Sequence, residues 1–135
     1  MEEKIIWTNG CFDILHRGHI ELFKYAKSLG DKLIVGIDSD EKVKKDKGPD
    51  RPFTNLKDRK FTLESIKYID EVKTFTSSQG LNDLIKEVKP FILIVGSDWV
   101  NKPVVGESHA QHVRFFERIG EYSTTNILEW KKNQK

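Results

Sequence analysis

Short apolar runs alternate along the chain with segments in which apolar residues recur every three or four positions. The apolar runs favour buried strands, which we expect at residues 4–8, 32–38, 71–75, 91–95 and 113–116. The periodic segments favour amphipathic helices, which we expect at residues 18–28, 55–68, 81–88 and 123–130. Asn55 is a suitable N-cap for the second helix, and we expect the apolar residues Phe61, Leu63, Ile66 and Ile69 on or near its inner face.

Strands that alternate with helices in this way predict an α/β domain with a five-stranded, mostly parallel sheet and helices on both of its faces. The charged segment 41–53, which contains Gly and Pro, is the best loop candidate. We expect one domain over residues 1–130, followed by a short frayed tail at 131–135.

Composition narrows the class of protein. Hydrophobic residues make up 37% and charged residues 33% of the 135 residues, and the formal net charge is only +2. This balance argues against wholesale binding to nucleic acid or membranes. No apolar run approaches the roughly 20 residues of a membrane-spanning helix, and residues 1–8 lack a signal-peptide pattern, so we expect a cytoplasmic protein. The single cysteine, Cys11, cannot form an internal disulfide, and we assign it no redox role.

Conspicuous polar residues follow several of the predicted strands. Because parallel strands end at one edge of a sheet, these residues should gather there, where such sheets bind ligands. They are Asn9 to Asp13 with His16 and His19 after the first strand, Asp38 and Asp40 after the second, Gly96, Asp98 and Trp99 after the fourth, and Arg118 with Ser123, Thr124 and Thr125 after the fifth.

The segment around His16 and His19 has the features of a phosphate site. Gly10 would let the backbone approach an anion closely. Two histidines three residues apart at a helix start would lie on one face, with Gly18 leaving space between them. The N-terminus of that helix would add partial positive charge and N–H donors. A turn histidine and a surface histidine, or a metal-binding pair without an obvious third ligand, are the alternatives; Asp13 and the two glycines together favour phosphate.

The stretch "TNGCFDILHRGHIELF" at residues 8–23 resembles the signature of the cytidylyltransferase-like nucleotidyltransferases, which combine a Gly-x-Phe-Asp turn with His-x-Gly-His. "YSTTNI" at 122–127 resembles the second phosphate motif of that superfamily. The resemblance implies a Rossmann-like fold and a reaction in which a phosphorylated sugar or polyol attacks the α-phosphate of a nucleoside triphosphate and releases pyrophosphate. It also implies Mg²⁺ as cofactor and a homodimer.

The resemblance assigns roles to individual residues. His16 and His19 would hold phosphate oxygens, Asp13 would hold the metal or nearby phosphates, and Arg59 would meet the phosphates. Among the loop lysines Lys44, Lys45 and Lys47, we favour Lys45 as a phosphate contact, although such a run is also typical of a solvated surface. The nucleotide-binding set would be Asn9, Gly10, Cys11, Phe12, Asp13, Gly18, Gly96, Asp98, Trp99, Arg118, Ser123, Thr124 and Thr125.

Two subfamilies compete for the substrates. "KGPDRPFTNLKDR" and "VVGESH" resemble the nucleotidyltransferase part of ADP-heptose synthases, which join ATP to a heptose 1-phosphate. "GSDW" and "ERIGEYSTT" are closer to glycerol-3-phosphate cytidylyltransferases, which use CTP. We favour the sugar phosphate because its shared segments are longer. No segment resembles the kinase half of the heptose enzymes, so this role would require a separate kinase.

Three other classes of function fit less well. A non-catalytic nucleotide-binding module would not require both His16 and His19. A dinucleotide-dependent oxidoreductase would require Gly-x-Gly-x-x-Gly in the first turn, which is absent. An RNA-binding protein could use the basic residues at 42–47, but acidic neighbours dilute that patch and no aromatic platform accompanies it.

Overall fold

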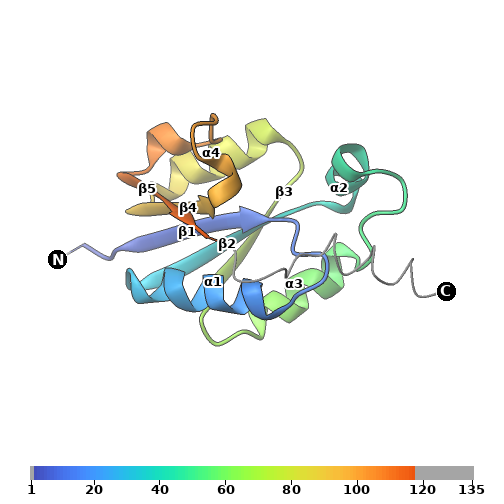
Figure 1. The fold of residues 1–135 in the computed structure, drawn as a ribbon, viewed down its shortest axis with the longest axis horizontal. Coiled ribbons are helices and arrows are strands. Elements are labelled where there is room, and N and C mark those ends of the chain that lie inside the picture. The colour runs from blue at the N-terminus through green and yellow to red at the C-terminus, as the bar shows by residue number, and fades with distance from the viewer. Residues whose placement is uncertain (1, 118–135) are drawn as a thin grey trace.

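The computed structural model describes residues 2–117, which form one five-stranded sheet flanked by helices (Figure 1). The strands are β1 (Ile5–Gly10), β2 (Lys32–Asp38), β3 (Glu71–Phe75), β4 (Ile92–Gly96) and β5 (His112–Phe116). The α-helices are α1 (Arg17–Ser28), α2 (Asp40–Lys47), α3 (Leu56–Glu64) and α4 (Ser78–Val88), and two short 3₁₀ turns, η1 (Ser97–Trp99) and η2 (Glu107–His109), precede β5.

The sheet has the order β3-β2-β1-β4-β5, and every neighbouring pair is parallel. This confirms the predicted five-stranded α/β architecture. The chain leaves the central strand β1 in one direction to form β2 and β3, and later returns to its other side to form β4 and β5. The carboxyl ends of β1 and β4 therefore lie next to each other at the point where the strand order reverses, which is where open α/β sheets bind ligands.

Each face of the sheet has its own apolar core. Helices α1 and α3 cover one face, where Ile6 and Val35 of the strands pack with Phe23 of α1 and Leu63 of α3. Helix α4 covers the opposite face, where Trp7, Ile34, Leu93 and Ile85 form a second cluster. Successive strand residues alternate between the faces, so Ile6 and Trp7 enter different cores. This double coverage explains the continuous apolar runs in the sequence.

The segment 41–53, predicted as a loop, instead begins with helix α2. Ser39 caps this helix by accepting a hydrogen bond from the backbone N–H of Lys42, and Gly48 follows its last residue. Acidic residues occupy its first turn and lysines its last turn, which complements the helix dipole. Because Val43 is its only buried residue, the helix has no apolar stripe, and the periodicity argument missed it.

Helix α3 starts after Asn55, whose side chain accepts a hydrogen bond from the backbone N–H of Asp58 as an N-cap. The predicted end at residue 68 was wrong, because the helix stops at Glu64. The inward placement of Phe61 was also wrong, since this residue is 72% exposed. Arg59 and Leu63, four residues apart, occupy the inner face instead, which turns Phe61 to the outside.

Residues 118–135 lie outside the part of the chain that the structure describes, so the predicted last helix and tail remain predictions. Within residues 2–117, no helix is both long enough and apolar enough to cross a membrane.

Candidate functional site

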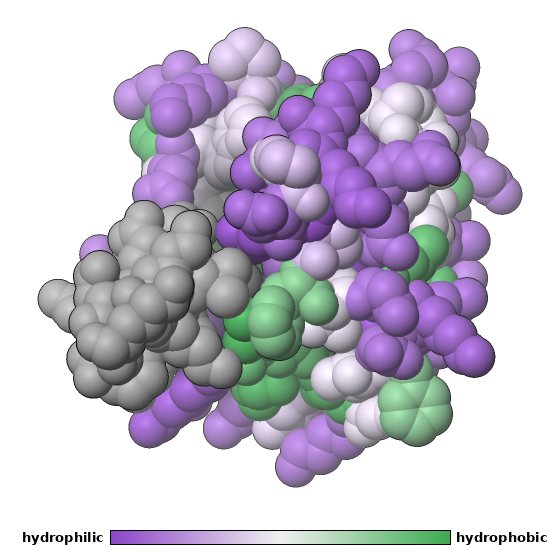
Figure 2. Space-filling view, turned by 90° about the vertical axis from the view of Figure 1, so that its right-hand side faces the viewer, coloured by the Kyte–Doolittle hydropathy of each residue, from purple (hydrophilic) through white to green (hydrophobic). Residues whose placement is uncertain are grey.

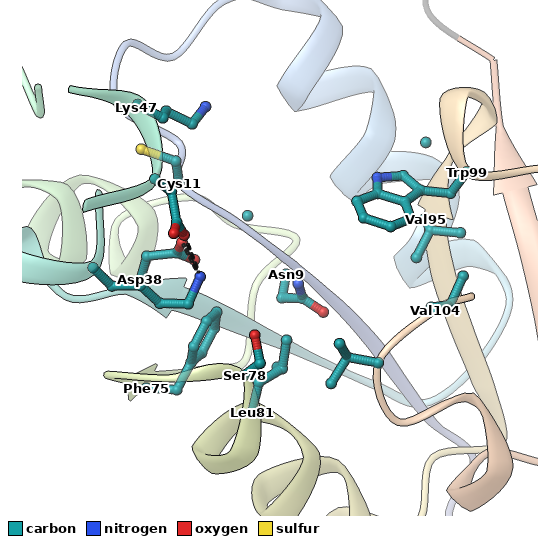
Figure 3. A pocket seen from close by; sticks show the side chains of 15 residues that line it. Asn9, Cys11, Asp38, Lys47, Phe75, Ser78, Leu81, Val95, Trp99 and Val104 are labelled. Carbon is teal, nitrogen blue, oxygen red and sulfur yellow. Dashed lines mark hydrogen bonds and ion pairs between the residues drawn. The ribbon is translucent and has the colours of Figure 1, made fainter. Parts of the chain in front are cut away.

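A cavity of about 480 Å³ opens at the carboxyl ends of the strands (Figure 3). Its walls come from β1 to β4, α2, α4, η1 and the segment that follows η1. The lining residues include Asn9, Gly10 and Cys11 after or within β1, Asp38, Lys42, Asp46 and Lys47 around α2, Phe75, Ser78 and Leu81 near α4, and Val95, Gly96, Trp99, Val104 and Val105 beyond β4. The sheet edge predicted from the sequence therefore does contain a cavity.

Asn9 lies in the middle of this cavity in Figure 3. The indole Nε1 of Trp7 donates a hydrogen bond to Asn9 Oδ1 at 2.9 Å, which fixes the orientation of the amide. The amide nitrogen Nδ2 thus remains available as a donor at the cavity. Trp7 is fully buried, and a Cβ on Gly36 would lie 2.6 Å from its ring. Gly36 therefore makes room for Trp7, which in turn orients Asn9; sequence analysis identified Asn9 but not its two supporting residues.

His16 and His19 form the start of helix α1. His16 is the N-cap, and its Nδ1 accepts a hydrogen bond from the backbone N–H of Gly18 at 3.0 Å. His19 Nδ1 accepts a hydrogen bond from the backbone N–H of His16 at 3.3 Å. The two rings stack with their centroids 3.9 Å apart. The histidines thus form a capping box, a role that the sequence analysis did not anticipate.

These hydrogen bonds determine which ring nitrogen carries the proton. A neutral imidazole whose Nδ1 accepts a hydrogen bond carries its proton on Nε2. Both His16 and His19 are therefore held as Nε2–H donors at the N-terminus of α1, where the helix dipole also favours an anion. Capping and phosphate binding are compatible, because they use opposite nitrogens of the same ring.

The turn after β1 connects the cavity to the histidines. Gly10 and Cys11 line the cavity, and the ring of Phe12 contacts the ring of His19 at a centroid distance of 5.3 Å. Phe12 has a left-handed backbone with φ of 49° and is buried. A Cβ on Gly10 would lie 3.1 Å from the Phe12 ring, so glycine permits this tight packing. Phe12 thus acts as a support beneath His19 in the described structure.

Asp13 holds the segment 51–54. Its side chain is fully buried, and Oδ2 accepts hydrogen bonds from Arg51 Nε and from the backbone N–H of Phe53, both at 2.8 Å. Oδ1 accepts a hydrogen bond from the backbone N–H of Thr54 at 2.7 Å. Burial by itself would raise the pKa of Asp13, but these hydrogen bonds and the charge of Arg51 outweigh it and lower the pKa below its usual value. A structural role explains this carboxylate, and the proposed metal contact stays a prediction.

Replacing Asp13 by Asn should lower the free energy of unfolding by about 2 kcal/mol at neutral pH, because Asn cannot accept all of these hydrogen bonds. Since folding lowers the pKa of Asp13, its contribution to stability is present above the pKa of the unfolded carboxyl and is lost as pH falls through the folded pKa. We therefore expect the difference between wild type and Asp13→Asn to shrink below about pH 4.

Urea unfolding at a series of pH values would measure this difference, and Asp50→Asn, which changes an exposed carboxylate near the same segment, is the matched control. Asp70 and Glu71 also have lowered pKa values, but they are present in all three proteins, so their contributions cancel in the comparison. A difference that did not change with pH would contradict the role given to Asp13.

Arg59 connects three parts of the chain around the site. Its guanidinium donates hydrogen bonds to the carbonyl oxygens of Thr54 and Cys11, both at 2.9 Å, and to Asp40 Oδ1 at 2.7 Å. The side chain of Arg59 is fully buried, whereas that of Asp40 is 38% exposed. In this structure Arg59 joins α3 to the turn after β1 and to the first turn of α2. It is placed to position the site, and direct contact with phosphate remains a prediction.

Helix α2 brings other lysines to the cavity than Lys45, which the sequence analysis favoured as a phosphate contact. Lys47 and Lys42 line the cavity, whereas Lys45 is exposed and is not among the lining residues. Of the three loop lysines considered from the sequence, Lys47 therefore has the best position to meet a phosphate. Lys42 was not among the lysines proposed to contact phosphate; the helical spacing of Lys42, Asp38 and Asp46 would have been the signal, had α2 been predicted.

The end of β4 contributes further predicted residues. Trp99 lines the cavity and is 49% exposed, and Gly96 also lines it, with open space within 4 Å of where a Cβ would lie. Asp98 is exposed on η1 and is not among the lining residues. Cys11 lines the cavity, and burial raises the pKa of its thiol, which disfavours the thiolate. Arg118, Ser123, Thr124 and Thr125 lie outside the described residues.

Within residues 2–117, no three His, Cys, Asp or Glu side chains are grouped so that they could hold a metal ion. The coloured part of the face at the carboxyl ends of the strands is mostly hydrophilic, with an apolar patch in its lower middle (Figure 2). This is the surface expected for a polar substrate, and Mg²⁺ sites commonly complete their coordination with substrate phosphates and water.

Comparison with known proteins identifies relatives over nearly the whole chain. The "Bifunctional protein HldE" of Helicobacter pylori (strain Shi470) is 45% identical over 128 residues, which cover 95% of this chain and 27% of that protein. The protein of the same name from a Nitratiruptor species is 46% identical over 127 residues, or 94% of this chain and 27% of that protein. The chain thus spans about a quarter of the length of these relatives.

A solved structure has the same fold. The crystal structure of the lipopolysaccharide core biosynthesis protein from Thermoplasma volcanium GSS1 matches with a TM-score of 0.69 and 23% identity, over 88% of this chain and 100% of that chain. The model of the family described as cytidylyltransferase-like matches residues 7–132, which include most of β1, the histidine pair and the other four strands. The chain therefore belongs to the cytidylyltransferase-like family of nucleotidyltransferases.

Proposed function

We propose that the protein joins the NMP part of a nucleoside triphosphate to a phosphorylated sugar and releases pyrophosphate, with ATP and a heptose 1-phosphate as the favoured pair. The observation that carries the reaction type is the arrangement of His16 and His19 at a helix N-terminus, where each Nδ1 accepts a backbone hydrogen bond and each neutral ring therefore carries its proton on Nε2. Two such donors suit a phosphoryl group that gains negative charge during the reaction.

The reaction requires no protein nucleophile. A phosphate oxygen of the acceptor forms a bond to the α-phosphorus while the bond from that phosphorus to the β-phosphate bridging oxygen breaks, and pyrophosphate leaves with that electron pair. The protein aligns the two substrates and stabilises the charge that accumulates on the α-phosphate oxygens. His16 and His19 would donate to these oxygens, and Asn9 Nδ2 would donate from the middle of the cavity.

The sugar phosphate is favoured over glycerol 3-phosphate for two reasons. First, the segments that resemble ADP-heptose synthases are longer than those that resemble glycerol-3-phosphate cytidylyltransferases. Second, two relatives that are 45% and 46% identical to this chain both carry the name bifunctional HldE. CTP with glycerol 3-phosphate is the second candidate, since "GSDW" at residues 96–99 matches that subfamily and places Trp99 at the cavity.

Mg²⁺ would share the charge of the triphosphate, in keeping with the general use of a divalent metal by nucleotidyltransferases. Asp13 does not fit the metal in its present arrangement, because both of its oxygens accept hydrogen bonds from residues 51–54. We therefore propose that the metal is held mainly by the triphosphate. A homodimer and a cytoplasmic location remain predictions, and sedimentation analysis would test the first.

The purified protein should release pyrophosphate from a nucleoside triphosphate only when a phosphorylated acceptor is present. Pyrophosphate release would be measured for ATP, CTP, GTP and UTP, each with heptose 1-phosphate and with glycerol 3-phosphate. We expect ATP with heptose 1-phosphate to give the highest kcat/KM. The highest value for CTP with glycerol 3-phosphate would instead support the second candidate, and pyrophosphate release without any acceptor would contradict the proposed reaction.

A further inference from the structure

The cavity has two chemically different ends. Cys11, Asp38 and Lys47 lie at one end, and Val95, Trp99 and Val104 lie at the other, with Asn9 between them (Figure 3). The first end offers charged groups, whereas the second offers aliphatic and indole surface. Two substrates that meet at a phosphate can share such a cavity only if each end accepts a different substrate. The chemistry of the charged end indicates which substrate binds there.

Lys42 neutralises much of the charge at that end. Its Nζ is 2.6 Å from Asp46 Oδ2 and 3.4 Å from Asp38 Oδ2, and its side chain is only 16% exposed. Burial by itself would lower the pKa of Lys42, but its contacts with the two carboxylates outweigh burial and raise it, so the ammonium stays charged. The same ammonium lies 5.8 Å from the centre of the Phe75 ring. Lys42 is therefore held in place by its neighbours.

The Oδ1 atom of Asp38 can accept a hydrogen bond from a ligand. The side chain is 14% exposed and lines the cavity, and its Oδ2 accepts the hydrogen bond from Lys42. Within residues 2–117, no side chain or backbone group donates a hydrogen bond to Oδ1. A carboxylate can only accept hydrogen bonds, and it repels phosphate at short range. The group that meets Asp38 must therefore be a donor, such as a hydroxyl.

We propose that Asp38, held by Lys42, selects the acceptor by accepting a hydrogen bond from a hydroxyl group of a polyhydroxylated sugar phosphate. This inference rests on the proposed function and specifies which end of the cavity the acceptor uses. The acceptor phosphate points towards Asn9 and the histidine turn, while its hydroxyls face Asp38 and Phe75. The nucleoside occupies the opposite end, where Trp99 and the two valines provide apolar surface for a base.

The test compares steady-state constants of wild type and Asp38→Asn. We expect KM for the sugar phosphate to rise about tenfold or more, because a hydrogen bond to a charged acceptor is lost. The kcat and the KM for ATP should stay within about twofold, which a general distortion of the site would not allow. Glu41→Gln, which removes an exposed carboxylate from the adjacent turn of α2, is the matched control and should leave all constants unchanged.

A panel of monodeoxy sugar 1-phosphates would identify the hydroxyl. One analogue should be a poorer substrate than its parent for wild type, and this difference should shrink in Asp38→Asn, because the neutral amide oxygen of Asn is a weaker acceptor for the hydroxyl than a carboxylate. A rise in KM for ATP instead of the acceptor would overturn the proposal and assign Asp38 to the nucleoside.

Calorimetric binding of the sugar phosphate to wild type and Asp38→Asn separates this proposal from the proposed function. An active wild type whose affinity for the sugar phosphate is unchanged in Asp38→Asn would overturn only the role of Asp38. A wild type that is inactive with every pair of substrates would contradict the proposed function. Even then, the acceptor subsite would be supported if Asp38→Asn bound the sugar phosphate more weakly than wild type does. The absence of sugar phosphate binding to wild type would overturn the subsite.

Discussion

Replacing His16 by Asn or His19 by Gln is expected to slow turnover about 10²–10³-fold, the loss typical of one preorganised donor to a developing oxyanion. These substitutions are chosen because the histidines also cap helix α1. Asn is a good N-cap residue, and Gln at the third helical position can accept the hydrogen bond from the N-cap backbone. Each variant therefore retains an acceptor in place of Nδ1 but has no imidazole Nε2–H. Initial rates of pyrophosphate release would measure the effect.

The corresponding alanine variants separate capping from catalysis. His16→Ala and His19→Ala remove both functions, so they should lose turnover and also about 1 kcal/mol in the free energy of unfolding. The Asn and Gln variants should lose turnover alone. If His16→Asn and His19→Gln kept near-normal rates while the alanine variants were destabilised, the histidines would serve only as caps, and the phosphate role would be wrong.

Replacing Arg59 by Leu should lower the free energy of unfolding by about 3–4 kcal/mol. The substitution leaves the carbonyl groups of Cys11 and Thr54 without their buried donor and removes the partner of Asp40. Because Asp40 is 38% exposed on its side chain, water can solvate it in the variant, which keeps the cost below that of a fully buried ion. Chemical denaturation of the variant and the wild type would measure the difference.

Arg59→Lys tests whether the guanidinium positions the site or contacts phosphate. A lysine keeps the charge but cannot reach three separated acceptors, so we expect a smaller loss of about 1–2 kcal/mol together with reduced turnover. Lys60→Met, on the exposed side of the same helix, should stay within about 0.5 kcal/mol of wild type. Unchanged stability of Arg59→Lys with a large drop in kcat would instead favour direct phosphate contact.

Strand positions could be predicted from the sequence because both faces of this sheet are buried. The run "KLIVGID" coincides with β2, and the predicted strand 71–75 coincides with β3. Helix α2 could not be found in the same way, since it buries only Val43 and depends on its cap and charges. Phe61 was placed inwards together with the other apolar residues of its segment, whereas the inner position belongs to Arg59, whose polar partners Cys11 and Asp40 are distant in sequence.

The sequence by itself determined the order of the five strands and of helices α1, α3 and α4, the parallel sheet and the positions of Asn9, Gly10 and the histidines at its carboxyl edge, because these follow from local periodicity and turn residues. Only the tertiary structure decided what Asp13, Arg59, Lys42 and Asp38 contact. Each of these charged side chains has partners supplied by segments that fold against it or by the next turn of an unexpected helix. A charged residue has the same appearance in a sequence whether it is solvated or buried against a partner, and the difference arises only when the segments pack together.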